Sequence, residues 1–243
     1  IEWQHPNMPW DSTQLWQANL TDGALVDKTL MAGADNSEAI FQPQWSPDNQ
    51  LYFVSDKNNW WNIYRIENCA VLPVLEMDGE FATPLWQFGM TTYDFIDANN
   101  IACIWTAKGI CHSGFINIIS AQLNPIDCHH SSMQPLTCHA HKLYVLTGAA
   151  ALPSELISIS SQATVESIYA PASLPLDSGD LAEPQSILFA SGNPADEAAH
   201  QVHAFYYPPT NAQHCGLDGE LPPVIALCHG GPTGATDSGL NLK

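Results

Sequence analysis

A pattern of short strands in the first two thirds of the chain constrains its fold more than any other feature. Residues 41–66 read "FQPQWSPDNQLYFVSDKNNWWNIYRI". Pro43-x-Trp45 opens a first strand, and the Ser-Pro-Asp-Asn that follows has the residue types of a tight turn. The next six residues alternate as a second strand, Asp56–Asn59 form another turn, and a third strand runs over 61–66.

This three-strand unit recurs. The middle strand, 51–56, is echoed at 101–106 and 143–148, and the third strand, 62–66, is echoed at 115–120 and 156–160. Pro84-x-Trp86 lies 41 residues after Pro43-x-Trp45, which predicts that Trp45 and Trp86 occupy equivalent positions. "LWQANL" (15–20) fits the same element one unit earlier, with "IEW" as the strand before it.

Steps of 40–53 residues with three or four short strands each are typical of β-propeller blades. A β-sandwich is the competing fold, but its turns recur without self-similarity at this period. We therefore expect a mainly β chain that begins with a partial β-propeller, three blades plus part of a fourth. The propeller is expected over residues 1–172, with blades at about 1–40, 41–80, 81–127 and 128–170.

A second unit follows the propeller. The segment "APASLPLDSGDLAEP" (170–184) has three prolines and no periodicity, which indicates a domain connection, and we place the linker at 173–184. Three apolar segments then predict three strands, the first two as a hairpin: 185–191, 202–209 and 222–229. We assign residues 185–243 to this second unit.

Several of these segments resemble the prolyl oligopeptidase family of serine peptidases. The similarity lies in "PQWSPDNQLYFVSD" with "WWNIYR", in "HPNMPWD" (5–11), in "QFGMTTYDF" (87–95) and in "ELPPVIALCHGGPTGATDSGLNLK" (220–243). The branch that these segments resemble most is the acylaminoacyl-peptidase and dipeptidyl-aminopeptidase-like enzymes. The resemblance covers essentially the whole chain, and it implies that 185–243 is the start of an α/β-hydrolase domain.

The resemblance also gives the glycine turn after the third segment a role. In α/β-hydrolases, this loop supplies a backbone N–H to the oxyanion hole, which stabilises the charge on the carbonyl oxygen under attack. The family pattern, His-Gly-Gly-Pro, places that donor at Gly231, next to Gly230, and makes His229 part of the turn. Plain turn chemistry is the alternative interpretation of such a Gly-Gly-Pro stretch.

The catalytic triad is the part that this sequence does not contain. The nucleophile motif G-x-S-x-G occurs nowhere in the 243 residues, and the family's Ser, Asp and His lie well downstream of the glycine turn. We therefore expect the chain to be a truncated and inactive part of a peptidase that releases N-terminal acylamino acids or dipeptides from short peptides, with the propeller restricting access. An esterase on the same fold and a non-enzymatic propeller scaffold stay open as alternatives.

The composition of the chain limits the classes of molecule that it is expected to bind. Six Lys and Arg face 25 Asp and Glu, a net charge of −19, which disfavours binding to nucleic acid. No apolar run approaches the ~18 residues of a membrane span. Seven cysteines with no CxxC argue against a disulfide framework and for a reducing, cytoplasmic compartment. We expect short peptide substrates and no cofactor, and a homo-oligomer stays open.

Two clusters of chemically notable residues have simpler explanations. Residues 128–141 hold two cysteines and four of the chain's histidines, but they lack the separated ligand pairs of structural zinc sites, so we expect no metal there. Trp60-Trp61 and Tyr206-Tyr207 could line a substrate path, but Trp61 is expected instead to pack between blades.

Overall fold

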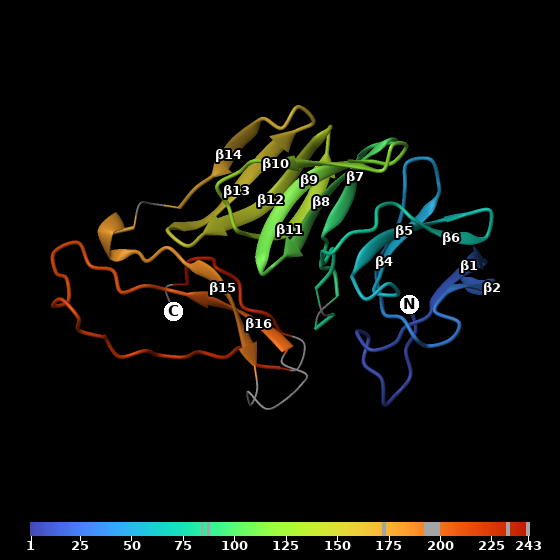
Figure 1. Cartoon of the computed structure of the whole chain (residues 1–243). Helices are drawn as coiled ribbons and strands as arrows, with labels where there is room; N and C mark the ends of the chain where they lie inside the picture. The colour runs from blue at the N-terminus through green and yellow to red at the C-terminus, as the bar shows by residue number, and fades with distance from the viewer. Residues whose placement is uncertain (84, 87, 172–173, 192–199, 232–233, 242–243) are drawn as a thin grey trace.

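Three four-stranded antiparallel sheets form most of the molecule (Figure 1). The computed structural model describes the chain except for residues 84, 87, 172–173, 192–199, 232–233 and 242–243. In each sheet, consecutive strands are neighbours. The first sheet holds β3 (Ile40–Trp45), β4 (Leu51–Ser55), β5 (Asn62–Glu67) and β6 (Ala70–Pro73). The second holds β7 (Tyr93–Asp97), β8 (Asn100–Ala107), β9 (Ile110–Asn117) and β10 (Gln122–Ile126), and the third holds β11 (Ser132–His139), β12 (Lys142–Ala149), β13 (Leu152–Ser160) and β14 (Val165–Tyr169).

A two-stranded sheet precedes these three, made of β1 (Leu15–Thr21) and β2 (Ala24–Ala32). An isolated bridge between Glu2 and Gln14 adds a short pairing where "IEW" was expected to be a strand. The chain is thus mainly β, with three complete blades and part of a fourth, and the predicted fold class is confirmed.

The repeat is visible in the registers. The predicted middle strands, 51–56, 101–106 and 143–148, coincide with β4, β8 and β12. Trp45 pairs with Leu51, whereas the residue that pairs with the equivalent Ile101 is Phe95. The predicted equivalence of Trp45 and Trp86 is therefore wrong. Trp86 lies in the loop before β7, so the matching Pro-x-Trp spacing does not reflect equivalent strands; Pro84 itself lies outside the described residues.

The turn after β3 forms as its residue types predict. The Ser46 hydroxyl accepts a hydrogen bond from the Gln50 backbone N–H at 2.9 Å, and the Ser46 carbonyl accepts one from the Asn49 N–H at 3.0 Å. Asn49 takes a left-handed backbone with φ of 64°, which asparagine tolerates better than most residues. This local chemistry reverses the chain and pairs β3 with β4.

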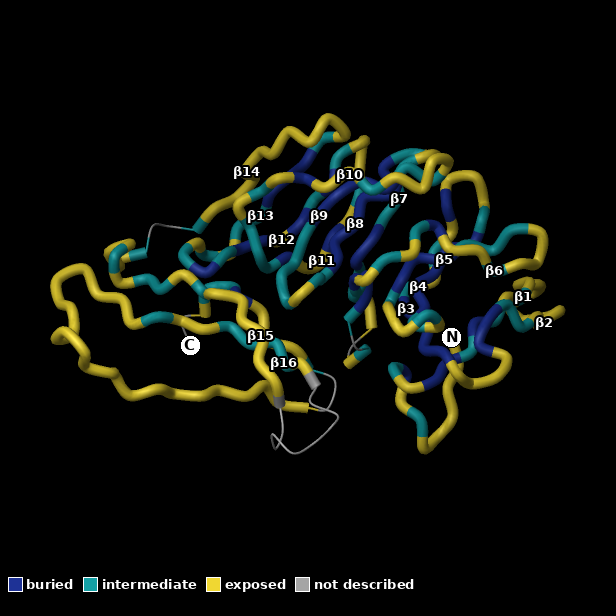
Figure 2. Tube along the Cα trace, viewed as in Figure 1, coloured by how far each residue is buried: buried dark blue, intermediate teal, exposed yellow. Residues whose placement is uncertain are grey.

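The core lies between the sheets, as Figure 2 shows by the dark strands at their centres. In β8, Ile101 and Cys103 pack toward the first sheet, whereas Ala102 and Ile104 pack toward the third. Because side chains alternate along a strand, a sheet with neighbours on both sides must be apolar on both faces. Trp61 packs against the same core at the first sheet, with its ring edge-on to Phe41 at 6.4 Å, so its predicted packing role is confirmed.

Polar side chains join the first strands of the three blades. Gln42 of β3 donates from Nε2 to the Tyr93 carbonyl at 2.6 Å, and its Oε1 accepts from the Thr92 N–H at 2.8 Å. The Asp94 carboxylate of β7 accepts from Gln44 Nε2 and from the Cys138 N–H, each at 2.6 Å. These side chains add hydrogen bonds across the blade boundaries.

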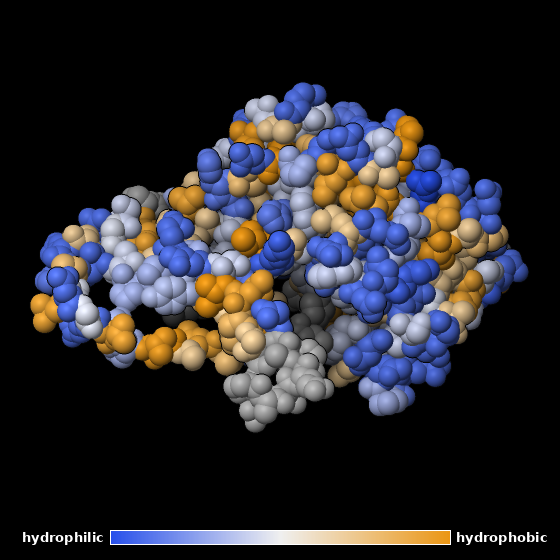
Figure 3. All heavy atoms as spheres, in the orientation of Figure 1, coloured by the Kyte–Doolittle hydropathy of each residue, from blue (hydrophilic) through white to orange (hydrophobic). Residues whose placement is uncertain are grey.

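After the third blade, a single turn of 3-10 helix, η1 (Ser178–Asp180), leads to a hairpin of β15 (Gln185–Ser191) and β16 (His200–Tyr206). Two of the three strands expected after the linker are thus present. The third is not: residues 222–229 form no strand. Leu221, just before this segment, and Val224, Ile225 and Leu227 within it are 83–91% exposed. Figure 3 shows hydrophobic atoms on the outer surface at the lower left of the molecule.

The prediction of a buried strand at 222–229 is therefore wrong for this chain. A strand needs a hydrogen-bonded neighbour, and an all-apolar one needs cover on both faces. In the part of the chain that the structure describes, β15 and β16 pair only with each other and leave this segment no neighbouring strand.

Candidate functional site

The glycine turn is exposed and has the backbone that only glycine adopts readily. Gly231 has φ of +73°, in the left-handed region where a side chain is strained. An ideal Cβ on Gly230 would have nothing within 4 Å, whereas one on Gly234 would lie 2.5 Å from the Gly230 carbonyl oxygen. Gly234 thus folds back against the turn. The ring nitrogen Nδ1 of His229 lies 3.3 Å from that same oxygen.

The turn lies against an aromatic side chain from the propeller. A Cβ built on Gly231 would lie 3.3 Å from Cζ2 of Trp86. The ring of Trp86 contacts that of Trp10, with centroids 4.4 Å apart. A second pair, Trp3 and Phe88, has centroids 6.1 Å apart and comes from the same two segments. We call Trp3, Trp10, Trp86 and Phe88 the aromatic cluster.

Both segments that carry the aromatic cluster are fixed by local hydrogen bonds. Near the N-terminus, the Asp11 carboxylate accepts from the Met8 N–H at 2.8 Å, and the Met8 carbonyl accepts from the Asp11 N–H at 3.0 Å. This turn presents Trp10. The loop before β7 is closed at its base, where the buried Thr92 hydroxyl donates to the Phe81 carbonyl. Trp86 and Phe88 lie in the part of the loop beyond that closure.

The chain after the turn is anchored to the third blade. Ser238 is 3% exposed, and its hydroxyl donates to that of Ser131 at 2.7 Å. Two residues later, the Leu240 N–H donates to the Ala149 carbonyl at 3.0 Å. The glycine turn itself lies against Trp86, and the chain that follows it is bonded to the third blade.

A groove of about 640 Å³ runs along the first strands of the three blades. Gly89 and Thr91, from the same loop as Trp86, line part of it. The other lining residues come from β3, β7 and the strands β11, β12 and β13 of the third sheet: Gln42, Pro43, Gln44, Tyr93, Asp94, Pro135, Leu136, Thr137, Tyr144, Val145, Leu146 and Leu156. The loop thus borders the groove and also touches the glycine turn.

Two groups of side chains resemble parts of a catalytic triad, but neither has the order serine, histidine, carboxylate. Ser186 Oγ lies 2.9 Å from His203 Nε2 across the β15–β16 hairpin, and among the described residues no carboxylate bonds the other ring nitrogen. In the third blade, Glu155 lies between its partners: it accepts from Ser167 Oγ at 2.6 Å and lies 2.9 Å from His130 Nε2. The histidine there cannot take a proton from the serine, because the carboxylate separates them.

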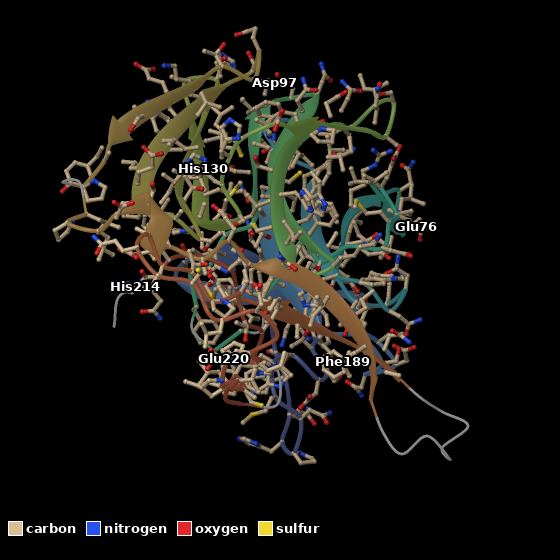
Figure 4. The ribbon with its side chains drawn as sticks, turned by 60° about the vertical axis from the view of Figure 1, so that its left-hand side comes forward. Glu76, Asp97, His130, Phe189, His214 and Glu220 are labelled. Atoms are coloured by element: carbon tan, nitrogen blue, oxygen red, sulfur yellow. The ribbon has the colours of Figure 1, made fainter. Side chains whose placement is uncertain are left out.

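The same third-blade contacts set the acidity of Glu155. The hydrogen bond from Ser167, and then that from His130, lowers the pKa of the Glu155 carboxyl below its ordinary value. Figure 4 labels His130, whose Nδ1 is buried without a hydrogen-bond partner. These contacts tie the start of the third sheet to its strands β13 and β14.

Three cysteines of the propeller, Cys103, Cys111 and Cys138, are poor candidates for a nucleophile. Burial raises the pKa of the Cys111 and Cys138 thiols to about 12, and it raises that of Cys103 as well. A thiol with so high a pKa is protonated at neutral pH and is a poor nucleophile. Within 128–141, His130 bonds to Glu155, whereas His141 bonds to the Ile96 carbonyl at 3.1 Å. The described residues hold no group of three or more candidate metal ligands.

The sequence placed Gly230 and Gly231 at the site but assigned no role to the aromatic cluster. Its signal was present, because "HPNMPWD" and "QFGMTTYDF" are two of the segments that resemble the peptidase family. Trp86 was instead assigned to a strand by its spacing from Trp45. Only the fold brings residues 3–10, 86–88 and 231 together.

No family model matches the sequence, and no curated protein matches it. Solved structures do. A puromycin hydrolase superposes with a TM-score of 0.89 at 28% identity over 98% of this chain and 36% of its own. A puromycin-hydrolyzing peptidase of Mycobacterium tuberculosis gives 0.88 at 28% identity, over 99% of this chain and 37% of its own.

More distant structures agree in fold. Prolyl oligopeptidase B from Galerina marginata superposes with a TM-score of 0.61 over 81% of this chain and 28% of its own, at 10% identity. At this identity, the likeness to the prolyl oligopeptidase shows a shared fold. The chain spans little more than a third of the length of the puromycin-hydrolysing neighbours.

Among the residues that the structure describes, no helix is long and apolar enough to cross a membrane.

Proposed function

We propose that this chain is part of a serine peptidase that releases N-terminal acylamino acids or dipeptides from short peptides. The observation that carries the proposal is the glycine turn, with Gly231 in a left-handed backbone beside the propeller loop. The likeness to puromycin-hydrolysing proteins at a TM-score of 0.89 supports it. The enzyme would be of the acylaminoacyl-peptidase or dipeptidyl-aminopeptidase type.

In this mechanism, the Gly231 N–H donates to the carbonyl oxygen of the scissile bond as a serine attacks the carbonyl carbon. Donors that are already oriented stabilise the oxyanion without rearrangement. The attacking Ser, with its His and Asp, would lie outside these 243 residues, which contain no G-x-S-x-G. The groove along the first strands of the blades would admit only short chains.

We also propose a cytoplasmic location for the protein. All seven cysteines are free, and Cys69, Cys215 and Cys228 are exposed. Exposed thiols that have no disulfide partner suit a reducing compartment.

The test uses the intact protein with Gly231→Ala. A side chain at φ of +73° is strained, and its Cβ would press on Trp86 at 3.3 Å, so the turn must shift and misalign its N–H. We expect kcat on a peptide chromogen to fall about 10²–10³-fold with little change in KM. Gly219→Ala is the matched control, because Gly219 has a similar φ of +81° but no neighbour within 4 Å.

Equal activity of the Gly231→Ala and Gly219→Ala proteins would contradict the oxyanion role. Acylated and free dipeptide chromogens, compared with a p-nitrophenyl ester, distinguish a peptidase from an esterase. Intact protein with no hydrolysis of any of these substrates would favour a propeller scaffold instead.

A further inference from the structure

Two cysteines lie opposite each other at the end of the β9–β10 ladder. Cys111 is in β9, and Cys128 comes two residues after the end of β10. The ladder ends with Ser113 paired to Ile126, so the same antiparallel register, continued by two residues, sets Cys111 opposite Cys128. Opposite residues in such a ladder have Cα atoms about 4.5–5.5 Å apart. That spacing lies within the range of about 4.4–6.8 Å that a disulfide spans.

Side-chain contacts place both sulfur atoms on the same face of the second sheet. The Cys128 sulfur lies 3.6 Å from the Ser113 hydroxyl. Ser113 and Cys111 are two residues apart in β9, so their side chains point to one face. Both cysteines pack against the hydrophobic cluster between the second and third blades. Burial is the main cause of the raised pKa of Cys111, and the neighbouring Cys128 adds to it, which agrees with two thiols side by side.

The cysteine pair can react with a small-molecule disulfide, because neither residue is fully buried. The Cys128 thiolate attacks one sulfur of that disulfide and releases one small thiol, which takes up a proton. The Cys111 thiolate then attacks the Cys128 sulfur of the mixed disulfide and releases the second small thiol. The protein loses two electrons and two protons, and the small disulfide gains both. Because burial raises the pKa of Cys111 to about 12, its step is the slow one and becomes faster as the pH rises.

The cysteine pair lies next to the residues that hold the chain after the glycine turn. Ser131, three residues after Cys128, accepts the hydrogen bond from the buried Ser238 hydroxyl at 2.7 Å. On the other side of this contact, Asp237 is close to Cys111, since its charge adds to the effect of burial on the pKa of that thiol. A movement of Cys128 therefore reaches Ser238 through only three residues of chain.

We propose that Cys111 and Cys128 form a reversible disulfide, and that this bond loosens the contact made by Ser238. Bonded sulfur atoms lie about 2 Å apart, so the Cys128 sulfur leaves Ser113 and the segment 128–131 is drawn toward β9. The chain after the glycine turn then loses part of its support, and the N–H of the turn is less well placed. This effect on catalysis rests on the proposed peptidase function, whereas the disulfide itself does not.

The experiment treats the intact protein with oxidised glutathione at about pH 8.5, where an ordinary thiol is half ionised. Alkylation and peptide mass spectrometry then map the thiols, and we expect a peptide cross-linked between Cys111 and Cys128 that dithiothreitol cleaves. The Leu240 N–H donates to the Ala149 carbonyl, and its hydrogen exchange should be about fivefold faster or more in the oxidised protein. On a peptide chromogen, kcat should fall about three- to tenfold and recover on reduction.

Serine variants test the order of the two steps. Cys111→Ser should stop at the mixed disulfide between Cys128 and glutathione, and Cys128→Ser should keep the kcat of the reduced protein and not respond to oxidation. Cys69→Ser is the matched control, because Cys69 is an exposed cysteine in the turn between β5 and β6 of the first blade. It should respond to oxidation as the unchanged protein does. Circular dichroism and thermal unfolding check that each variant is folded.

The outcomes separate this inference from the proposed function. Oxidised protein in which Cys111 stays free, or in which Cys128 is linked to another cysteine, would overturn the pair. A cross-link with unchanged exchange at Leu240 would overturn the loosened contact, and faster exchange with unchanged kcat would overturn its effect on catalysis. A cross-link and faster exchange in a reduced protein that hydrolyses no peptide would overturn the proposed function and leave the disulfide and its effect on the chain standing.

Discussion

Gly33 illustrates how a single residue without a side chain fixes the segment that carries Trp10. It has φ of +83°, and a Cβ built on it would lie 2.1 Å from the Thr13 carbonyl oxygen. Its N–H donates to the buried Glu38 carboxylate at 2.9 Å, while the Glu38 carbonyl accepts from the Thr13 N–H at 2.9 Å. The end of β2 and the N-terminal segment can approach this closely only at glycine.

We predict that Gly33→Ala destabilises the protein by about 3 kcal/mol, because the left-handed strain and the backbone clash add together. The measurement is urea unfolding followed by tryptophan fluorescence. Gly23→Ala is the control, since Gly23 has φ of +79° but nothing within 4 Å, and it should cost only about 1 kcal/mol. Equal costs for the two variants would show that the contact with Thr13 is unimportant.

At the scale of elements, the local sequence pattern predicted the strands and turns that depend on nearby residues alone. The middle strands β4, β8 and β12 and the turn at Ser46 follow from alternation and from turn-forming side chains. The position of Trp86 could not be found in this way, because a Pro-x-Trp match does not say which of its residues pair with a neighbour. The apolar segment 222–229 failed for a related reason: its sequence suits a buried strand, but a strand also needs a partner.

In the candidate site too, residues in a local sequence pattern could be predicted, whereas contacts between distant segments could not. Gly230 and Gly231 are assigned through the family resemblance, which rests on the local His-Gly-Gly-Pro pattern, and their role stays a prediction. Trp3 contacts Phe88, Trp10 contacts Trp86, and Trp86 lies beside Gly231; these residues are far apart in sequence, and no local pattern encodes such contacts. Only the closure of the loop at Phe81 and Thr92 places the rings beside the turn.

The joints between blades give a prediction at this scale. Asp94→Ala should destabilise the protein by about 2–4 kcal/mol, because it leaves the Cys138 N–H and the Gln44 amide without an acceptor at a partly buried site. Chemical denaturation of the 243-residue chain measures it. Asp97→Ala is the control, since Asp97 bonds only within its own turn, to Asn99 and Asn100, and should cost less than about 1 kcal/mol. Equal denaturation midpoints for the two variants would show that Asp94 does not stabilise the contact between the blades.

At the scale of the whole molecule, this chain combines three complete blades with a less complete C-terminal part. The three complete blades bury their facing surfaces in continuous clusters. The hairpin β15–β16 and the exposed apolar segment after it are less complete, since most of the side chains of 221–227 have no cover among the described residues. The aromatic cluster and the glycine turn meet where these two parts touch.

That division predicts what the 243-residue chain does on its own. It should not react with a fluorophosphonate serine probe, whereas the intact protein should label stoichiometrically. A reactive serine needs a histidine that takes its proton and a carboxylate that orients that histidine. Among the described residues, Ser186 has the histidine but no carboxylate on the other nitrogen of that ring, and Ser167 bonds to a carboxylate that separates it from His130. A glycine turn can stabilise only an oxyanion that another group creates, so we expect no turnover from Gly231 alone. The measurement is in-gel fluorescence of the probe on equal amounts of the two proteins. Stoichiometric labelling of the chain that disappears in Ser186→Ala or Ser167→Ala would prove that it contains a working nucleophile after all.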